Sequence, residues 1–408
     1  MKLDRYHLTY CTNIHPGERW DEVKTTLQHY LPSVREAVAA NQSFGIGLRL
    51  SHLATEDILS GNQLAHFHRW LAENNCYVFT MNAFPYGGFH HQRVKDEVHR
   101  PDWTHPERLH YTLRSFDVLA RLLPAGMEGS ISTSPLSYKL WHPTESARDQ
   151  VRTQATQQLA QVAEYLYQQR QTTGQVLHLD LEPEPDGLLE DTQEVIDYFH
   201  RWILPQGSPY LQKQLGISPD EAERCLRTHI RICYDVCHFA VEYERPRDVF
   251  TRWQQAGIKI GKIQISAALR ATFPPSVSER VDIRQAFESL VESTYLHQVI
   301  ARTHDDTLIR YRDLPEALHH IDRSDIQEWR THFHVPLFVA HYGALKATRS
   351  DIREVLNIVR EGSSESDASA PHLEVETYTW EVLPTEIQRG LGESIVRELR
   401  WVQDYYQS

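Results

Sequence analysis

Short apolar runs rich in β-branched and aromatic residues recur along the chain, and each is followed by a segment with helical periodicity. The runs end in turn residues and are too apolar to leave one face in water, which is typical of parallel strands covered by helices. The predicted strands are 6–12, 44–51, 77–83, 129–134, 176–182, 230–237, 260–266 and 372–378. The predicted helices are 20–40, 54–75, 105–123, 144–171, 190–203, 246–256, 276–289 and 384–405.

The order of these elements is compatible with an open doubly wound sheet or with a closed barrel. An open sheet commonly carries a glycine-rich phosphate turn after its first strand. Here the first strand runs into NIHPGE (13–18), which contains no GxGxxG pattern. Eight strands also close a barrel. The chain is therefore predicted to be an α/β protein with a (β/α)₈ TIM barrel, formed by a single domain over 1–408.

Two segments do not fit the simple alternation. Residues 308–342 contain a ninth strand-like run, which we interpret as an elaboration between strands seven and eight. Residues 361–370 are small and polar and cannot bury enough apolar surface to order themselves, so they predict a flexible surface loop.

Charge and composition exclude several classes of function. Lys and Arg number 42 against 55 Asp and Glu, and the net charge of −13 repels nucleic-acid phosphates and anionic lipid surfaces. No stretch approaches about 18 consecutive apolar residues, so we expect neither membrane insertion nor a secretory leader, and we expect a cytoplasmic location. The five scattered cysteines predict no disulfide framework, and Cys233 and Cys237 are interpreted as buried strand residues.

Carboxylates gather at the predicted strand ends. Strand five ends in Glu182, strand six in Asp235 and strand eight in Glu376. The carboxyl ends of barrel strands surround one hollow, where unpaired carboxylates repel one another unless a cation lies between them. Oxygen ligands suit hard divalent ions. The sequence therefore predicts one divalent metal cation (Mn, Mg, Co or Zn). Asp180 and Glu374 lie one alternation deeper and are either ligands or partners of arginines such as Arg49 and Arg231.

Further polar side chains are predicted at the same mouth. The loop 84–95 mixes glycines, aromatic rings and cations, so it either holds an anionic or hydroxylated ligand or is a turn with its aromatics folded beneath it. The predicted substrate contacts are His15, Tyr86, Arg93, Lys139 and His238.

Several motifs resemble known proteins. The pattern of charged residues at the strand ends resembles that of the xylose-isomerase-like TIM barrels. It consists of Glu182, the Asp-x-x-His of Asp235 and His238, and Glu376. This superfamily of sugar and sugar-phosphate isomerases and epimerases also contains endonuclease IV. The phrases HLTYCTNIHPGE, FTMNAFPYGGFHHQRVK, GSISTSPLSYK and HLEVETYTWEVLP resemble more specifically the EboE family of metabolite traffic proteins. The resemblance implies a xylose-isomerase-like barrel with a divalent-metal centre. It implies little about the reaction, because that family is named for its metabolite-export gene clusters.

The resemblance leaves the fourth metal ligand open. In the epimerases a histidine at the end of strand seven usually supplies it, whereas this chain has Gln264 there. Either Gln264 coordinates through its carbonyl oxygen, or a histidine from 331–334 takes the place. We favour His334, because it shares a face with His332 and precedes an apolar run that suggests a buried strand.

Three functions are consistent with these residues. The first is a metal-dependent isomerase or epimerase of a small sugar-like molecule, with Glu182 and Glu376 as the acid/base pair. The second is a non-catalytic binding or hand-off protein with a decayed isomerase site, which holds an aromatic or lipid-linked metabolite. The third, a metal-dependent phosphodiesterase, is disfavoured by the net charge of −13.

Overall fold

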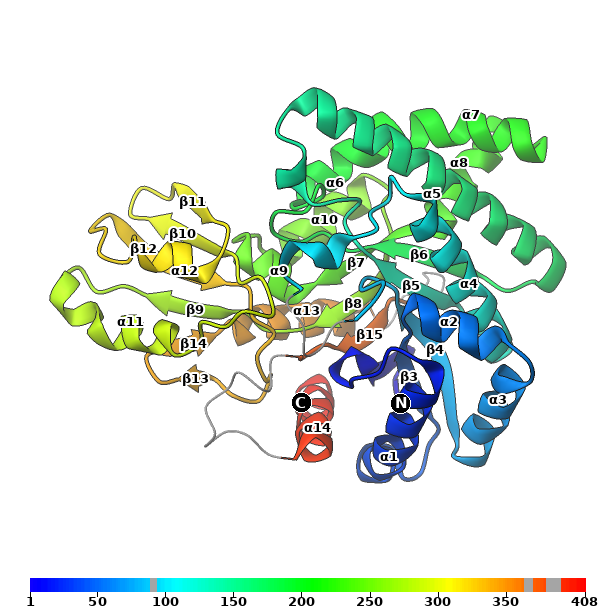
Figure 1. Ribbon diagram of the computed structural model, residues 1–408, viewed down its shortest axis with the longest axis horizontal. Helices are drawn as coiled ribbons and strands as arrows, with labels where there is room; N and C mark the ends of the chain where they lie inside the picture. The colour runs from blue at the N-terminus through cyan, green and yellow to red at the C-terminus, as the bar shows by residue number, and fades with distance from the viewer. Residues whose placement is uncertain (89–93, 363–369, 379–389) are drawn as a thin grey trace.

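The computed structural model describes residues 1–88, 94–362, 370–378 and 390–408, and a nine-stranded sheet lies at the centre of this part of the chain (Figure 1). A short first strand, β1 (Lys2–Leu3), pairs antiparallel with the second, and all other ladders in this sheet are parallel. The parallel strands are β2 (Tyr6–Tyr10), β3 (Phe44–Arg49), β4 (Cys76–Asn82), β5 (Gly129–Thr133), β6 (Leu177–Leu181), β7 (Ile230–Asp235), β8 (Ile260–Ile265) and β15 (His372–Val375). All eight predicted strands are confirmed, but β7 ends at Asp235, so Cys237, which was expected on a buried strand, instead lies buried on the helix α9 (Val236–Val241).

The sheet curls into a nearly closed barrel in the order β2-β15-β8-β7-β6-β5-β4-β3. The barrel closes between β3 and β2. Among the described residues, the parallel pairing there is an isolated bridge between Cys11 and Gly47. Threonine hydroxyls replace carbonyl acceptors here: the Gly47 N–H donates to Thr9 Oγ1 (3.0 Å) and the Arg49 N–H donates to Thr12 Oγ1 (2.8 Å). The predicted (β/α)₈ barrel is therefore confirmed.

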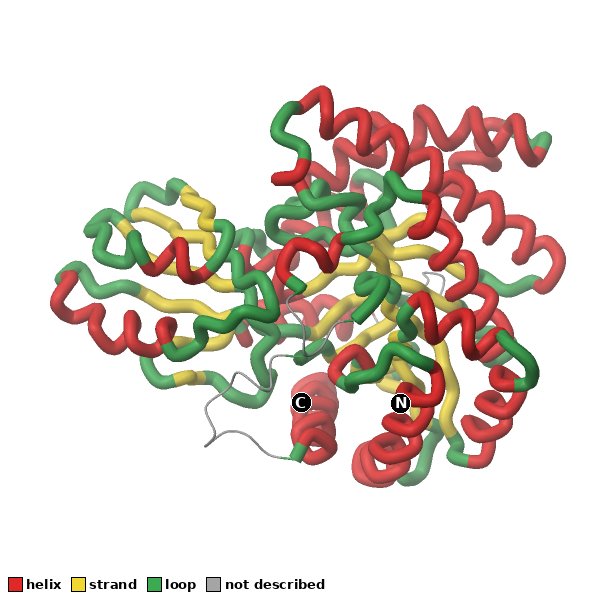
Figure 2. The backbone as a smooth tube through the Cα atoms, viewed as in Figure 1, coloured by secondary structure: helices red, strands yellow, loops and turns green. Residues whose placement is uncertain are grey.

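Helices surround the barrel strands (Figure 2). Among the described residues, none of the helices is both long and apolar enough to cross a membrane. The helices are α1 (Trp20–Ala39), α2 (His52–Leu59), α3 (Gln63–Glu73), α4 (Pro106–Leu122), α5 (Glu145–Thr173), α6 (Thr192–Tyr198), α7 (Leu204–Leu215), α8 (Pro219–His229), α9 (Val236–Val241), α10 (Pro246–Gln255), α13 (Arg349–Glu361) and α14 (Leu391–Gln407).

Two helix predictions need correction. The single helix predicted over 54–75 is two helices, α2 and α3, because Gly61 takes a left-handed φ of 53° between them. The helix predicted over 190–203 continues through a π-helical turn, η4 (Phe199–Ile203), into α7. The first part of the predicted final helix (384–389) lies outside the described residues, as does most of the predicted flexible loop (363–369).

The elaboration between strands seven and eight is a second sheet, drawn on the left of Figure 1. Within the described residues it has six antiparallel strands in the order β11-β10-β12-β9-β14-β13. Its elements are β9 (Leu269–Thr272), α11 (Val281–Glu288), β10 (Val299–Thr303), β11 (Leu308–Tyr311), α12 (Leu314–Leu318), β12 (Ile326–Thr331), β13 (His341–Tyr342) and β14 (Leu345–Ala347). We call it the inserted sheet.

The apolar run after His334 is not the buried strand that the sequence suggested. The strand β12 ends at Thr331, and the following backbone is irregular. Two of its N–H groups form hydrogen bonds that belong to no pairing between strands. Val335 N donates to Ala267 O (3.0 Å), and Leu337 N donates to Glu398 Oε1 (3.2 Å). Pro336 between them has no N–H to give to a neighbouring strand.

A buried ion pair lies inside the barrel. Lys262 on β8 donates from Nζ to Glu374 Oε2 on β15 (2.9 Å), and both side chains are completely buried. A Cβ atom on Gly47 would lie 1.7 Å from Glu374 Oε1, so the glycine makes room for the carboxylate. The partner of Glu374 is therefore Lys262, and Arg49 instead donates to the carbonyl oxygen of Gly17 (3.2 Å).

Candidate metal centre

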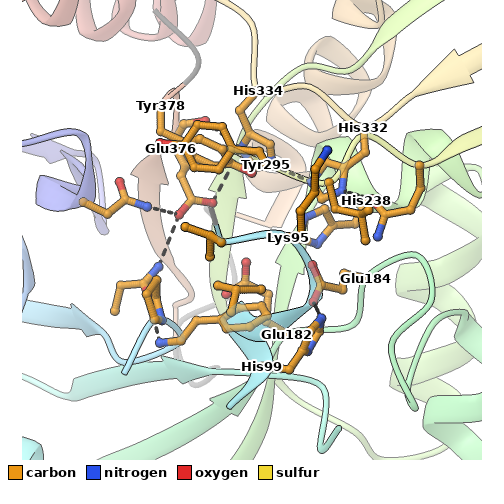
Figure 3. Close-up of a pocket in the computed structure, with 18 residues that line it drawn as sticks. Lys95, His99, Glu182, Glu184, His238, Tyr295, His332, His334, Glu376 and Tyr378 are labelled. Atoms are coloured by element: carbon orange, nitrogen blue, oxygen red, sulfur yellow. Dashed lines mark hydrogen bonds and ion pairs between the residues drawn. The ribbon is translucent and has the colours of Figure 1, made fainter. Parts of the chain in front are cut away.

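A cavity opens at the carboxyl ends of the barrel strands, where the inserted sheet meets the barrel (Figure 3). About 620 Å³ of empty space, part of which is open solvent, lies between its lining residues. Its lining combines polar side chains with apolar and aromatic ones that include Phe84, Tyr295 and Tyr378. Segments of both sheets line this cavity, so the insertion helps to build it.

Three carboxylates from three barrel strands meet at the floor. Glu182 follows β6, Asp235 ends β7 and Glu376 follows β15, and one oxygen from each lies within 4.8 Å of the others. All three residues are buried. The side-chain amides of Asn13 (2.7 Å) and Asn82 (3.2 Å) donate to Glu376 Oε1 and fix the orientation of that carboxylate.

The electrostatics of this cluster favour a cation. Burial, and then repulsion from neighbouring carboxylates, raise the pKa of Glu182 and of Glu376 well above the usual range. Asp235 is anchored through Oδ1, which accepts from His238 N (3.0 Å) and Ser266 Oγ (2.8 Å). Glu182 Oε2 and Asp235 Oδ2 are buried and accept no hydrogen bond from any described residue. Such oxygens fit a divalent cation, which supplies the missing positive charge.

Three buried histidines border the carboxylates. His238 lies on α9, and His332 and His334 follow β12 of the inserted sheet. His334 Nε2 is 3.9 Å from Asp235 Oδ2, and its Nδ1 is 3.6 Å from Glu376 Oε2. Burial lowers the pKa of all three imidazoles, which keeps them neutral and able to coordinate a metal.

Gln264 is the other candidate for the fourth ligand. It lies on β8 two residues after Lys262, so its side chain is on the inner side of the barrel. In register it is opposite Asp235 on one side and Glu374 on the other. The residue is fully buried, and neither atom of its amide has a hydrogen-bond partner among the described residues. An unsatisfied amide beside the carboxylates is consistent with a bound cation or water.

The comparisons with known proteins bear on the fold. No protein-family model and no curated protein matches the chain. Among solved structures, it is similar to a xylose isomerase-like TIM barrel protein from Mycobacterium smegmatis in complex with magnesium, with a TM-score of 0.51, 10% identity, and coverage of 100% of this chain and 98% of that one. The chain has the xylose isomerase-like TIM-barrel fold.

Two further similarities are weaker. One is to the IOLI protein with a binding zinc atom (TM-score 0.47, 11% identity, 98% of each chain). The other is to a xylose isomerase domain protein from Alicyclobacillus acidocaldarius subsp. acidocaldarius (TM-score 0.43, 12% identity, 98% of this chain and 100% of that one).

The loop 84–95 reaches the cavity with some of its residues. Phe84 and Lys95 line it, and the Lys95 ammonium forms an ion pair with Asp313 (2.7 Å). Tyr86 is outside the lining, with its ring against His52 at a centroid distance of 4.2 Å. The predicted substrate contact Arg93 lies outside the described residues.

Two other predicted contacts are engaged elsewhere. Neither His15 nor Lys139 lines the cavity. His15 Nε2 forms a hydrogen bond with the Tyr10 hydroxyl (2.9 Å). Lys139 forms ion pairs with Glu190 and with Glu194 (2.9 Å for the latter). Of the predicted substrate contacts described, His238 is the one in the cavity lining.

Several lining residues were not predicted from the sequence. Glu184 shares strand-like alternation with Glu182, which was a usable signal, and its Oε1 is 3.2 Å from His99 Nε2. Burial lowers the pKa of His99 to about 3, so it is neutral. Asn13 and Asn82 carry no motif, and they become informative only when their amides are seen to hold Glu376.

Proposed function

We propose that this protein is a divalent-metal-dependent isomerase or epimerase acting on a small polyhydroxylated or carbonyl-bearing metabolite. The cluster of Glu182, Asp235 and Glu376 carries the proposal, because it is buried and has oxygens without hydrogen-bond donors. The magnesium in the similar Mycobacterium smegmatis barrel is consistent with it. The donor set suits Mn, Mg, Co or Zn.

The proposal assigns a task to each residue. Glu182, Asp235 and Glu376 would hold the cation together with His334 or Gln264. A bound divalent cation polarises a carbonyl and its neighbouring hydroxyl. Glu182 Oε2, which has no donor among the described residues, is the atom that takes the proton from the carbon between them. Glu376, held by two amides, is the second member of the acid/base pair.

A second candidate function is non-catalytic binding or hand-off of an aromatic or lipid-linked metabolite. The aromatic side chains of the cavity lining favour it: the ring centroids of Tyr295 and Tyr378 lie 5.2 Å apart, and Tyr378 also stacks on His334. Such rings offer flat apolar surface to a ring or an acyl chain. The resemblance to the EboE family connects this candidate with metabolite traffic.

Metal content tests the metal centre. We expect the purified protein to carry divalent cation, and the chelated protein to melt at a lower temperature until Mn²⁺ or Zn²⁺ is restored. Cation at 100 times its dissociation constant stabilises a folded protein by about 2.7 kcal/mol. Elemental analysis and melting curves before and after chelation measure both effects. Absence of stoichiometric metal together with an unchanged melting temperature would refute the metal centre.

The fourth ligand is tested by three single substitutions. If His334 is the ligand, His334→Ala should weaken cation binding about 10-fold or more, and Gln264→Ala should weaken it less. Glu376→Gln is the reference, since it keeps the shape and removes the charge. Calorimetric titration of each variant with Mn²⁺, after a melting curve has shown it to be folded, gives the ranking. The reverse ranking would assign Gln264, and wild-type affinity in all three would mean that the centre lies elsewhere.

A further inference from the structure

Three buried side chains meet on one side of the cavity, and they are Glu184, His238 and His332 (Figure 3). One carboxylate oxygen of Glu184 and one ring nitrogen of each histidine lie within 4.8 Å of one another. Glu184 has His99 as a neighbour, with His99 Nε2 3.2 Å from Glu184 Oε1. Burial lowers the pKa of His99 to about 3, so this imidazole brings no positive charge to the carboxylate.

Both histidines of this group carry a lone pair on Nε2. His238 Nδ1 is 2.9 Å from Pro183 O, and His332 Nδ1 is 2.8 Å from Gln298 Oε1. These oxygens can only accept, so each Nδ1 carries the proton and donates it. Gln298 is held in this orientation because its Nε2 donates to Pro185 O (3.0 Å). The two imidazoles and the carboxylate of Glu184 are therefore three hydrogen-bond acceptors.

The three acceptors match the hydrogen-bonding capacity of an ammonium group. A hydroxyl group has one proton to donate, whereas a protonated amine has three. Acceptors that each bond one of these protons at about 2.9 Å lie about 4.7 Å from one another, because the bonds diverge at tetrahedral angles. That separation is within the 4.8 Å observed here. A proton donated to His332 Nε2 would also reduce its repulsion with His334 Nε2, an acceptor 3.3 Å away whose ring donates from Nδ1.

Charge supports the same ligand. Glu184 borders the cluster of Glu182, Asp235 and Glu376, which we call the carboxylate centre. The four carboxylates carry four negative charges when ionised, and one divalent cation balances two of them. Among the described lining residues, Lys95 is the one lysine or arginine, and its ammonium is paired with Asp313 (2.7 Å). A positively charged group on the substrate would supply the charge that Glu184 lacks.

We propose that the substrate of this cavity is an amino-bearing polyhydroxylated molecule, such as an amino sugar or an amino alcohol, whose ammonium group binds Glu184, His238 and His332. The inference rests on the proposed function and deepens it, since the hydroxyl and carbonyl oxygens of the same molecule would face the carboxylate centre. Glu184 and His332 are thus specificity-determining residues, which select an amine over a hydroxyl group at this position.

Two compounds that differ in one group test the inference: 1-amino-1-deoxy-D-glucitol and D-glucitol. Full-length protein with Mg²⁺, which prefers oxygen ligands, is titrated calorimetrically with each compound in an amine-free buffer at pH 7, where the amine is protonated. We expect the amine to bind about 10-fold or more tightly than D-glucitol, the factor typical of a hydrogen bond to a charged group. Glu184→Gln should abolish this preference and keep the affinity for D-glucitol. Glu398→Gln is the matched control, because it removes a buried carboxylate outside the cavity lining, and it should keep the preference.

The outcomes separate this inference from the proposed function. Equal affinities in the wild type, no binding of the amine, or an unchanged preference in Glu184→Gln overturns the ammonium site and leaves the metal centre standing. If the protein binds no Mg²⁺ but shows a preference that Glu184→Gln removes, the ammonium site stands and the metal-dependent function fails.

Gln298→Leu covers the case in which Glu184→Gln does not fold. It removes the acceptor that keeps the proton of His332 on Nδ1, so the preference for the amine should fall about threefold or more. An unchanged preference in this variant, once its melting curve has shown it to be folded, contradicts the proposal.

Discussion

Lys262→Met should lower the free energy of unfolding by about 3–5 kcal/mol, as expected when one partner of a buried ion pair is removed and the other keeps its charge. Lys262 and Glu374 are completely buried and 2.9 Å apart inside the barrel. Lys262 Nζ also donates to Met81 O (2.9 Å), and that carbonyl would lose a donor as well. Urea unfolding of the wild type and the variant measures the difference.

A double substitution shows whether the charge is responsible. Lys262→Met with Glu374→Gln leaves no net charge at the pair, so it should be more stable than Lys262→Met alone. Lys346→Met, on the exposed side of β14, should stay within about 0.5 kcal/mol of the wild type. Glu374→Gln alone completes the comparison. If the double variant loses as much free energy of unfolding as the two single variants lose together, the two residues are not coupled, and the buried ion pair does not explain the loss.

Glu398→Gln should stabilise the protein at pH 8 by on the order of 3 kcal/mol and leave it unchanged near pH 4.5. Burial raises the pKa of the Glu398 carboxyl from 4.5 to about 8, although its Oε1 accepts from Thr377 Oγ1 (2.6 Å) and Leu337 N. Between these two pH values the folded protein keeps a proton that the unfolded chain has lost. Stability therefore falls as the pH rises through this window, by about 1.4 kcal/mol per unit. Glutamine keeps the acceptor oxygen and has no such proton to lose.

Melting temperatures of the wild type and Glu398→Gln at pH 5 and pH 8 measure this effect, and comparison at equal pH removes the contribution of other titrating groups. Glu393→Gln, an exposed change on the same helix, should give the same small difference at both pH values. A gain from Glu398→Gln that does not grow between pH 5 and pH 8 would contradict the raised pKa.

The barrel could be predicted because the sequence pattern that indicates each strand lies within that strand and the residues next to it. Each strand is a short apolar run, and Pro183 ends β6 just after Leu181. The inserted sheet could not be predicted in the same way, because its pairings are distant in sequence. Leu269 of β9 pairs with Thr331 on one side and with Ala347 on the other. Nothing in the sequence near any of the three indicates these partners.

In the candidate site, too, some residues could be predicted from the sequence and others could not. Glu182, Asp235 and Glu376 were placed at strand ends by alternation, and the structure brings them together, while their role as ligands stays a prediction. Lys139 was expected in the mouth, but Glu190 and Glu194 engage it, and no local pattern links residues some 50 positions apart. Lys262 was overlooked, because a lysine within an apolar strand gives no sign of its partner on another strand.

The inserted sheet joins the barrel mouth through Arg310, which pairs with Glu190 (3.3 Å) and Glu242, and through the histidine segment that follows β12. A cation held by groups from both sheets is thermodynamically linked to their docking. Its binding strengthens the association of the sheets, and a sheet that is already docked binds the cation more tightly by the same factor. Substitutions at the Arg310 contact would therefore change the affinity for the proposed cation, although Arg310 lies outside the proposed ligand set.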